Sequence, residues 1–230
     1  FAFPKTQAPT AVALTSRNEF ALVTVWDLEK MKGQLAVFVL DSQHKDGLMG
    51  LYCWHDPKPG LPNPGGFTSY KLLGYVDLPG LAAPSAVCAY GSGWDQWLHT
   101  VDGKNAQPRE LDAADPKVRQ TFYDRKQWNY RWCSESGFAV VASKLEDRVA
   151  FVDLRPLFAY YREMYFGAEE SYKKTLAVGP GPRQWPPTFE AEPRQKPVVV
   201  SVQPTPLPTP TAVICSVSED DPSVLVAFQA

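Results

Sequence analysis

The chain of 230 residues has little of what marks several common functional classes. Its 23 Lys and Arg residues are balanced by 25 Asp and Glu residues, and the formal net charge is −2. A near-neutral chain lacks the clustered cations with which proteins displace counterions from nucleic acid. No apolar run approaches the roughly 18–20 residues that a membrane-spanning helix needs. The sequence therefore predicts neither a nucleic-acid partner nor a transmembrane segment.

Motifs that signal catalysis or cofactor binding are also absent. The sequence has no Gly-rich phosphate loop, no GxSxG nucleophile elbow and no HExxH zinc motif. The Pro/Gly-rich segments 57–66 and 179–187 are not followed by the helix that phosphate binding requires. There are only three histidines, and they occupy unrelated positions: His44, His55 and His99. We therefore expect no cofactor.

The four cysteines are too few for a disulfide scaffold at this length. Cys88 and Cys215 follow small or β-branched apolar residues at nearly matching positions, which predicts buried free thiols. Cys53 and Cys133 lie beside aromatic residues in irregular segments and could pair in an oxidising compartment. No CxxC or Cys/His spacing indicates zinc.

What the chain does have is apolar material and a recurring phrase. Hydrophobic residues make up 44% of the sequence and aromatic residues 13%, enough for a core. A short phrase occurs four times, as Pro9-Thr10-Ala11-Val12, Pro84-Ser85-Ala86-Val87, Gly137-Phe138-Ala139-Val140 and Pro210-Thr211-Ala212-Val213. A recurring supersecondary unit predicts an array of similar sheets.

Strand-like segments surround these phrases. They are rich in β-branched and aromatic residues, and we expect strands over 11–15, 20–28, 34–40, 71–78, 138–143, 148–154 and 197–202. Two long insertions rich in Pro and Gly interrupt the repeats, the first over 43–69 and the second including 180–187.

Helical signals are confined to two places. Asp115 is a good N-cap and Pro116 suits the first helical position, so a short amphipathic helix is expected after them. Pro156 similarly opens a Tyr-rich helix over Leu157–Phe166, which Gly167 ends, and Ala168–Leu176 could continue it. Both helices would decorate the sheets.

The repeats resemble the blades of a β-propeller of the YVTN or WD40-like kind. The resemblance rests on the stretches APTAVALTSRNEFALVTVWDLE, APSAVCAYGSGWDQWLHTVD, SGFAVVASKLEDRVAFVDL and TPTAVICSVSEDDPSVLVAF, and Trp26-Asp27 is similar to the WD dipeptide. It implies an all-β fold in one domain, 1–230, with repeat starts near 9, 84, 137 and 210 and with short helical and Pro-rich insertions. About three and a half blades would be present, whereas a propeller commonly closes with about four to eight. We therefore expect part of a larger propeller. Propellers with YVTN-like repeats are often secreted or surface-located, which implies a periplasmic or secreted protein.

Two clusters are candidate ligand-binding residues. Trp54, His55 and Asp56 form the first cluster. Adjacent residues of an extended chain point to opposite sides, so His55 and Asp56 make no catalytic relay by themselves. The alternative to a binding site is a polar loop held by Trp54. The second places aromatic rings around a hairpin, and rings with a few polar groups hold sugars or peptides. If Trp97 and His99 share one face of a strand, Leu98 lies on the other face. The alternative to a binding site is packing of Trp97 in the core. This second cluster consists of Trp94, Trp97 and His99.

Three aspartates close strand-like segments at similar repeat positions: Asp27, Asp102 and Asp153. Equivalent positions in successive blades form rings, so these carboxylates could bind a cation. Asp at a strand end also accepts hydrogen bonds from the N–H groups of the following turn, which is the simpler interpretation.

The sequence favours a non-enzymatic binding or scaffold module. Its loops and central channel would present a surface to a protein or a small-molecule ligand. The alternative is a propeller enzyme, a lactonase-like hydrolase or a quinoprotein-type oxidoreductase, with a metal at the channel mouth. Such enzymes use a convergent set of acidic, Asn and His residues, and the sequence shows none.

Overall fold

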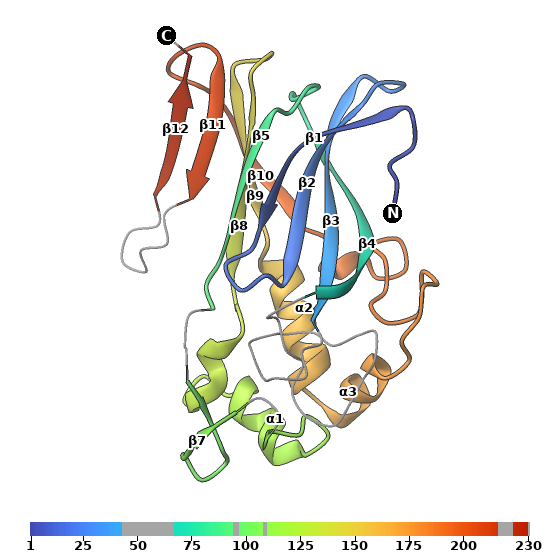
Figure 1. The fold of residues 1–230 in the computed structure, drawn as a ribbon, viewed down its shortest axis with the longest axis vertical. Helices are drawn as coiled ribbons and strands as arrows, with labels where there is room; N and C mark the ends of the chain where they lie inside the picture. Colours follow the sequence, from blue (N-terminus) through green and yellow to red (C-terminus); the bar gives the residue numbers. More distant parts are fainter. Residues whose placement is uncertain (43–66, 94–96, 108–109, 216–222, 230) are drawn as a thin grey trace.

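The described part of the protein is mostly β-sheet with few helices. A computed structural model describes residues 1–42, 67–93, 97–107, 110–215 and 223–229. Strands account for 41% of the described residues and helices for 19%, and the strands form four antiparallel sheets, none of them closed. Three of the four sheets stand side by side in one part of the molecule, and the smallest sheet lies with the helices at the opposite end (Figure 1). None of the helices in these ranges is long and apolar enough to cross a membrane.

The first sheet is a four-stranded meander in sequence order. Its strands are β1 (Gln7–Leu14), β2 (Phe20–Asp27), β3 (Lys32–Ser42) and β4 (Phe67–Leu78). The predicted strands over 11–15, 20–28, 34–40 and 71–78 are confirmed within a few residues at each end. Their β-branched and aromatic residues suit a pleated surface that is buried on at least one face.

The second sheet has the same strand order but is interrupted twice. It consists of β5 (Ala86–Gly91), β8 (Gly137–Ser143), β9 (Arg148–Asp153) and β10 (Val198–Pro204). Residues 92–136 separate β5 from β8. From here on we call them the first insertion; they are not the Pro/Gly-rich segment 43–69 named above. Residues 154–197, the second insertion, separate β9 from β10. A further pair, β11 (Pro210–Cys215) and β12 (Val224–Phe228), forms a two-stranded sheet.

The insertions hold the helices. The first contains the small hairpin β6 (Leu98–His99) and β7 (Asn105–Ala106), helix α1 (Pro116–Tyr123) and the 3-10 helix η2 (Trp128–Trp132). The second contains α2 (Arg155–Phe166), α3 (Glu169–Thr175) and the 3-10 helix η3 (Pro193–Gln195). Both helical predictions are confirmed. The carboxylate of Asp115 caps α1 by accepting a hydrogen bond from the N–H of Lys117 at 2.8 Å.

Strand β8 of the second sheet is buried on both faces because its side chains alternate between two hydrophobic clusters. Ala139 and Val141 belong to the main core, which also contains residues of the first sheet and of α2. Val140 and Ala142 belong to a second cluster that includes Val213 of the β11–β12 sheet. Alternation along a strand sends successive side chains to opposite faces. The second sheet is therefore the middle layer of the described fold.

Three of the four recurring phrases begin strands that lie in a row. Strand β5 contacts both β1 and β11, as the side-by-side strands of Figure 1 show. In each strand a hydroxyl just before the alanine donates to the carbonyl of the residue that pairs with that alanine. The three contacts are Thr10 to Thr24, Ser85 to Ala142 and Thr211 to Ala227, each at 3.3 Å. The phrases starting at 9, 84 and 210 are thus equivalent in structure.

The remaining phrase, at Gly137, is not equivalent, and its prediction is wrong. It begins β8, which pairs with β5 in the same sheet, so that Ala139 lies opposite Ala89. The expectation that all four phrases hold matching places in neighbouring sheets fails here. The phrase has Gly and Phe where the others have Pro and a hydroxyl residue. Its small and β-branched residues fit any strand that is buried on both faces.

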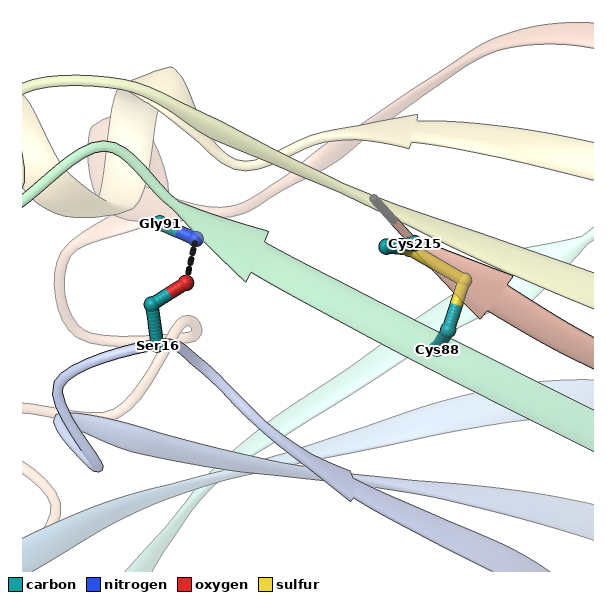
Figure 2. Close-up of a disulfide and its surroundings, with 4 residues drawn as sticks. All are labelled: Ser16, Cys88, Gly91 and Cys215. Atoms are coloured by element: carbon teal, nitrogen blue, oxygen red, sulfur yellow. Dashed lines mark hydrogen bonds between the residues drawn. A yellow bond between two sulfur atoms is a disulfide. The ribbon is translucent and has the colours of Figure 1, made fainter. Parts of the chain in front are cut away.

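Strand β5 is joined to its neighbours on both sides (Figure 2). Cys88 of β5 and Cys215 of β11 form a disulfide, with their Cα atoms 5.7 Å apart. On the other side, the N–H of Gly91 donates to the hydroxyl of Ser16 at 3.0 Å. The prediction of free thiols at Cys88 and Cys215 is therefore wrong. Strands β5 and β11 begin with equivalent phrases and lie side by side, so cysteines at matching positions in them come together. A prediction made for each cysteine separately could not show this pairing.

Candidate functional site

The structure describes two of the six predicted ligand-binding residues. Trp97 and His99 lie in the first insertion, at the β6–β7 hairpin. The other four lie outside the described residues: Trp54, His55, Asp56 and Trp94. The first predicted cluster thus lies wholly outside the described residues, and the second is described at Trp97 and His99.

Trp97, His99 and Trp128 form what we call the aromatic surface. The Trp97 side chain is 63% exposed and the Trp128 side chain 67% exposed. The rings of His99 and Trp128 lie 5.3 Å apart between centroids, tilted by 36°. Leu98, between Trp97 and His99, is only 3% exposed. Leu98 thus lies toward the core and Trp97 toward solvent, while His99 is half-buried and its Nδ1 atom is buried.

The hairpin that carries this surface is held in place by a buried amide. The Nδ2 group of Asn129 donates to the carbonyl of His99 at 2.7 Å, and its Oδ1 accepts from the N–H of His99 at 2.8 Å. The same Nδ2 donates to the hydroxyl of Thr121 in α1 at 2.8 Å. Asn129 is fully buried. The position of His99 relative to Trp128 is therefore set by α1 and η2, and the surface is preorganised.

Charged side chains beneath the surface stabilise η2. The guanidinium of Arg162 lies 4.1 Å from the centroid of the Tyr130 ring. It donates hydrogen bonds to the carbonyl of Phe122 at 2.6 Å, to that of Tyr130 at 3.0 Å and to that of Cys133. The Tyr130 hydroxyl donates to Glu135, and burial is the main cause that raises the pKa of Tyr130. These groups bind one another, so we assign them a structural role.

Cys133 is not an activated nucleophile. Its side chain is buried and forms no disulfide with any described residue, and Cys53, the partner considered for it, lies outside the described ranges. Burial raises the pKa of its thiol to about 12, against the opposing effect of the Arg162 charge. A thiol reacts as its thiolate, so this residue is inert at neutral pH in the folded protein.

The three aspartates do not form a ring. Asp27 ends β2 and accepts hydrogen bonds from the N–H groups of Glu29 and Lys30 at 3.2 and 3.0 Å. Asp153 ends β9 and binds both the N–H and the guanidinium of Arg155. Asp102 lies in the exposed turn between β6 and β7. The simpler interpretation, acceptance of N–H groups from the following turn, is thus confirmed for Asp27 and Asp153.

Within the described ranges, no group of three or more His, Cys, Asp and Glu residues could hold a metal ion. No convergent acid–base pair accompanies the aromatic surface among these residues either. What the surface offers chemically is ring stacking, together with the polar edges of indole and imidazole.

Sequence reasoning missed a pocket of about 270 Å³ in the second insertion. It is lined by aromatic, apolar and charged side chains: Tyr160, Met164, Lys174, Ala177, Arg183, Trp185, Pro187, Ala191 and Glu192. The signal available in the sequence was the Arg183-Gln184-Trp185 run inside a Pro/Gly-rich segment. An indole in such a segment needs a packing partner, and here that partner is α2.

No protein-family model, no curated protein and no solved structure matches this chain. The argument on function therefore rests on the geometry of the molecule.

Proposed function

We propose that this chain is a non-enzymatic binding module whose aromatic surface takes a protein or a small-molecule ligand. The observation that carries the proposal is the exposure of Trp97 and Trp128, each about two-thirds open to solvent. Trp97 lies at the β6–β7 hairpin and Trp128 begins η2, and Asn129 joins these two elements. Large exposed aromatic side chains are enriched where proteins bind partners. A ring in a fixed orientation also loses little conformational entropy on binding.

We further propose that the sheets are blades of a β-propeller of the YVTN or WD40-like kind. Two meanders with the same strand order and a row of first strands, β1, β5 and β11, support it. The shared hydroxyl contact of Thr10, Ser85 and Thr211 supports the equivalence of the three units. An experimental structure in which β1, β5 and β11 do not line a common axis would contradict this architecture.

The disulfide between Cys88 and Cys215 supports a periplasmic or secreted location, since disulfides persist in oxidising compartments. We propose that location for the protein. Alkylation of thiols in intact cells, followed by mass spectrometry, tests it: Cys88 and Cys215 should be protected from alkylation until a reductant is added.

The binding function is tested with a double variant, Trp97→Ala with Trp128→Ala. Leu145→Ala is the matched control, because Leu145 is 69% exposed but lies in the β8–β9 turn. The wild type and both variants are applied to peptide and oligosaccharide arrays, and each hit is titrated by calorimetry. We expect a ligand that binds the wild type and the control and binds the double variant at least about tenfold more weakly, a typical loss for a hot-spot aromatic pair.

Equal binding by all three proteins would contradict the assignment of the surface. Metal analysis of the purified protein addresses the enzyme alternative. Stoichiometric Ca²⁺ or Zn²⁺ would favour the lactonase-like hydrolase or quinoprotein-type oxidoreductase and contradict the non-enzymatic proposal.

A further inference from the structure

The pocket of the second insertion has an apolar floor. The side chains of Tyr160, Met164 and Trp185 are all nearly fully buried and line it. The rings of Tyr160 and Trp185 stack with centroids 6.0 Å apart and planes 29° apart. The indole N–H of Trp185 donates to the hydroxyl of Tyr165 at 2.9 Å. The buried polar edge of the indole is thus satisfied. The guanidinium of Arg194 also lies over the Tyr160 ring, 4.9 Å from its centroid, so the floor offers a ligand ring edges and the Met164 thioether and not open ring faces.

The rim of the pocket carries a net positive charge, because three cations, Lys174, Arg183 and Arg194, face two carboxylates, Glu163 and Glu192. Lys174 and Arg183 line it, are exposed, and form no ion pair with any residue in the described ranges. The one carboxylate in the lining, that of Glu192, is paired with Arg194 at 3.1 Å. Arg194 also binds Glu163 at 3.1 Å. The nearby acids are therefore engaged with Arg194, and the two rim cations remain available for an anion.

The loop that supplies Arg183 and Trp185 is fixed by a buried lysine. Lys71 of β4 is 8% exposed, and its ammonium donates to the carbonyls of Gly179, Gly181 and Gln184 at 2.8, 2.9 and 3.0 Å. The N–H of Trp185 also donates to the carbonyl of Ala177 at 2.9 Å. A loop bound at four points to its surroundings holds its lining residues before a ligand arrives, which lowers the entropy cost of binding.

Polar and apolar groups are therefore separated in a small, preformed pocket. At about 270 Å³ it lies near the lower end of the range of about 300–1,000 Å³ seen for ligand sites, so its ligand is small. A negative group would lie at the rim, where Lys174 and Arg183 can donate charge-assisted hydrogen bonds. A small apolar body would contact the edges of Tyr160, Met164 and Trp185 beside the guanidinium of Arg194.

From this arrangement we infer that the second insertion is a binding site for a small aromatic carboxylate. The site shares no lining residue with the aromatic surface of Trp97, His99 and Trp128. It does not depend on the binding function proposed for that surface. The ligand is a free small acid, because the pocket is too small for a folded partner and is bordered on several sides by the insertion itself.

Indole-3-acetate and its neutral isostere indole-3-acetamide are the probes. The two molecules have nearly the same shape and differ in charge, so the ratio of their affinities measures the contribution of the rim cations. Calorimetry or ligand-detected NMR on the full chain should show the acid binding at least about tenfold more tightly than the amide, the low end expected for a charged hydrogen-bonded pair. The preference should shrink as salt is added.

The rim is tested by the double variant Lys174→Gln with Arg183→Gln. It should lower the affinity for the acid to that for the amide and leave the amide unchanged. Lys173→Gln is the matched control, because Lys173 is the neighbouring cation on α3 but pairs with Glu170 at 3.2 Å. This control should retain the preference for the acid. Both substitutions alter exposed side chains, so thermal unfolding of the variants should match that of the wild type.

The pocket itself is tested by Ala191→Phe, which places a ring at an exposed lining position. Both probes should then lose binding. Three results would overturn the inference: equal affinity for acid and amide in the wild type, retention of the acid preference by the double variant, or no binding of either probe at millimolar concentration.

Discussion

The first two sheets share a strand order but differ in how their strands are connected. Strands β1, β2 and β3 are joined by tight turns over 15–19 and 28–31, whereas the second sheet accommodates residues 92–136 and 154–197 between its strands. The entropy cost of closing a loop grows only slowly with its length, so the second sheet retains its pairing. Strand pairing thus maintains the fold, while the insertions of the second sheet carry both candidate binding sites that the structure describes.

The largest expected effect concerns the disulfide, which joins β11 to the second sheet and has no counterpart among the described contacts of the first sheet. The double variant Cys88→Ser with Cys215→Ser should lower the free energy of unfolding by about 2–5 kcal/mol, the usual range for a native disulfide closing a long loop. Denaturant titration measures the loss. Amide exchange should accelerate in β11 and β12 and remain unchanged in β1–β4.

Reductant is the control for this prediction. It should destabilise the wild type and leave the double variant unaffected. Wild-type protein whose intact mass shows all four cysteines reduced after purification in air would contradict the covalent link between the sheets.

A smaller effect is expected where the first sheet contacts the second insertion. Lys71→Met should cost about 1–3 kcal/mol, because the carbonyls of Gly179, Gly181 and Gln184 lose a buried donor. Exchange should increase over 179–185. Lys32→Met is the control, because Lys32 bonds Asp77 at a more exposed site.

The same lysine gives a signed pH dependence. Burial lowers the pKa of Lys71 to about 8 from its ordinary value of 10.5, and the three carbonyl dipoles oppose that shift. Between these pH values the unfolded chain binds the proton more tightly, so unfolding becomes less favourable as the pH rises from about 8 to 10.5. Buried tyrosines also titrate at alkaline pH and would affect stability in both proteins. The measured quantity is therefore the difference in the free energy of unfolding between wild type and Lys71→Met, from urea titrations at several pH values. A difference that does not change with pH would contradict the shift.

The smallest expected effects test whether strands β1, β5 and β11 are structurally equivalent. Thr10→Val, Ser85→Ala and Thr211→Val should each cost about 0.5–1.5 kcal/mol, the usual value of one hydrogen bond. Thr10 should cost the most, because its single hydroxyl proton is shared between the carbonyl of Thr24 at 3.3 Å and the closer carbonyl of Pro84 at 2.6 Å, across the boundary between sheets. Thermal unfolding of the three variants provides the ranking. Should Thr211→Val prove the most destabilising, this account of the boundary would be wrong.

Most strands and helices were predictable because their signals are local. The N-cap at Asp115 and the Pro that opens α2 act within one helical turn, and the β-branched runs of the first sheet need no partner to be recognised. Pairing is not local. Nothing in the Gly137 phrase itself reveals that β8 lies beside β5 rather than beginning a new sheet.

The candidate sites divide in the same way. Trp97 and His99 lie two positions apart, and their pattern indicated that Leu98 would lie on the opposite face of the strand, but it favoured core packing of Trp97, whose side chain is exposed in the structure. Trp128 and Asn129 complete the aromatic surface from the next elements of the chain, and only the tertiary fold brings them to His99. The pocket of the second insertion was less predictable still, because the lysine that holds its loop belongs to β4 of the first sheet.

The bridge between Cys88 and Cys215 spans 127 positions of the chain and encloses both insertions. A protease that cuts the backbone anywhere within either insertion would therefore produce two pieces that still migrate together until a thiol reagent is added. The segments that carry the candidate binding residues could be nicked during the life of the protein without releasing either part.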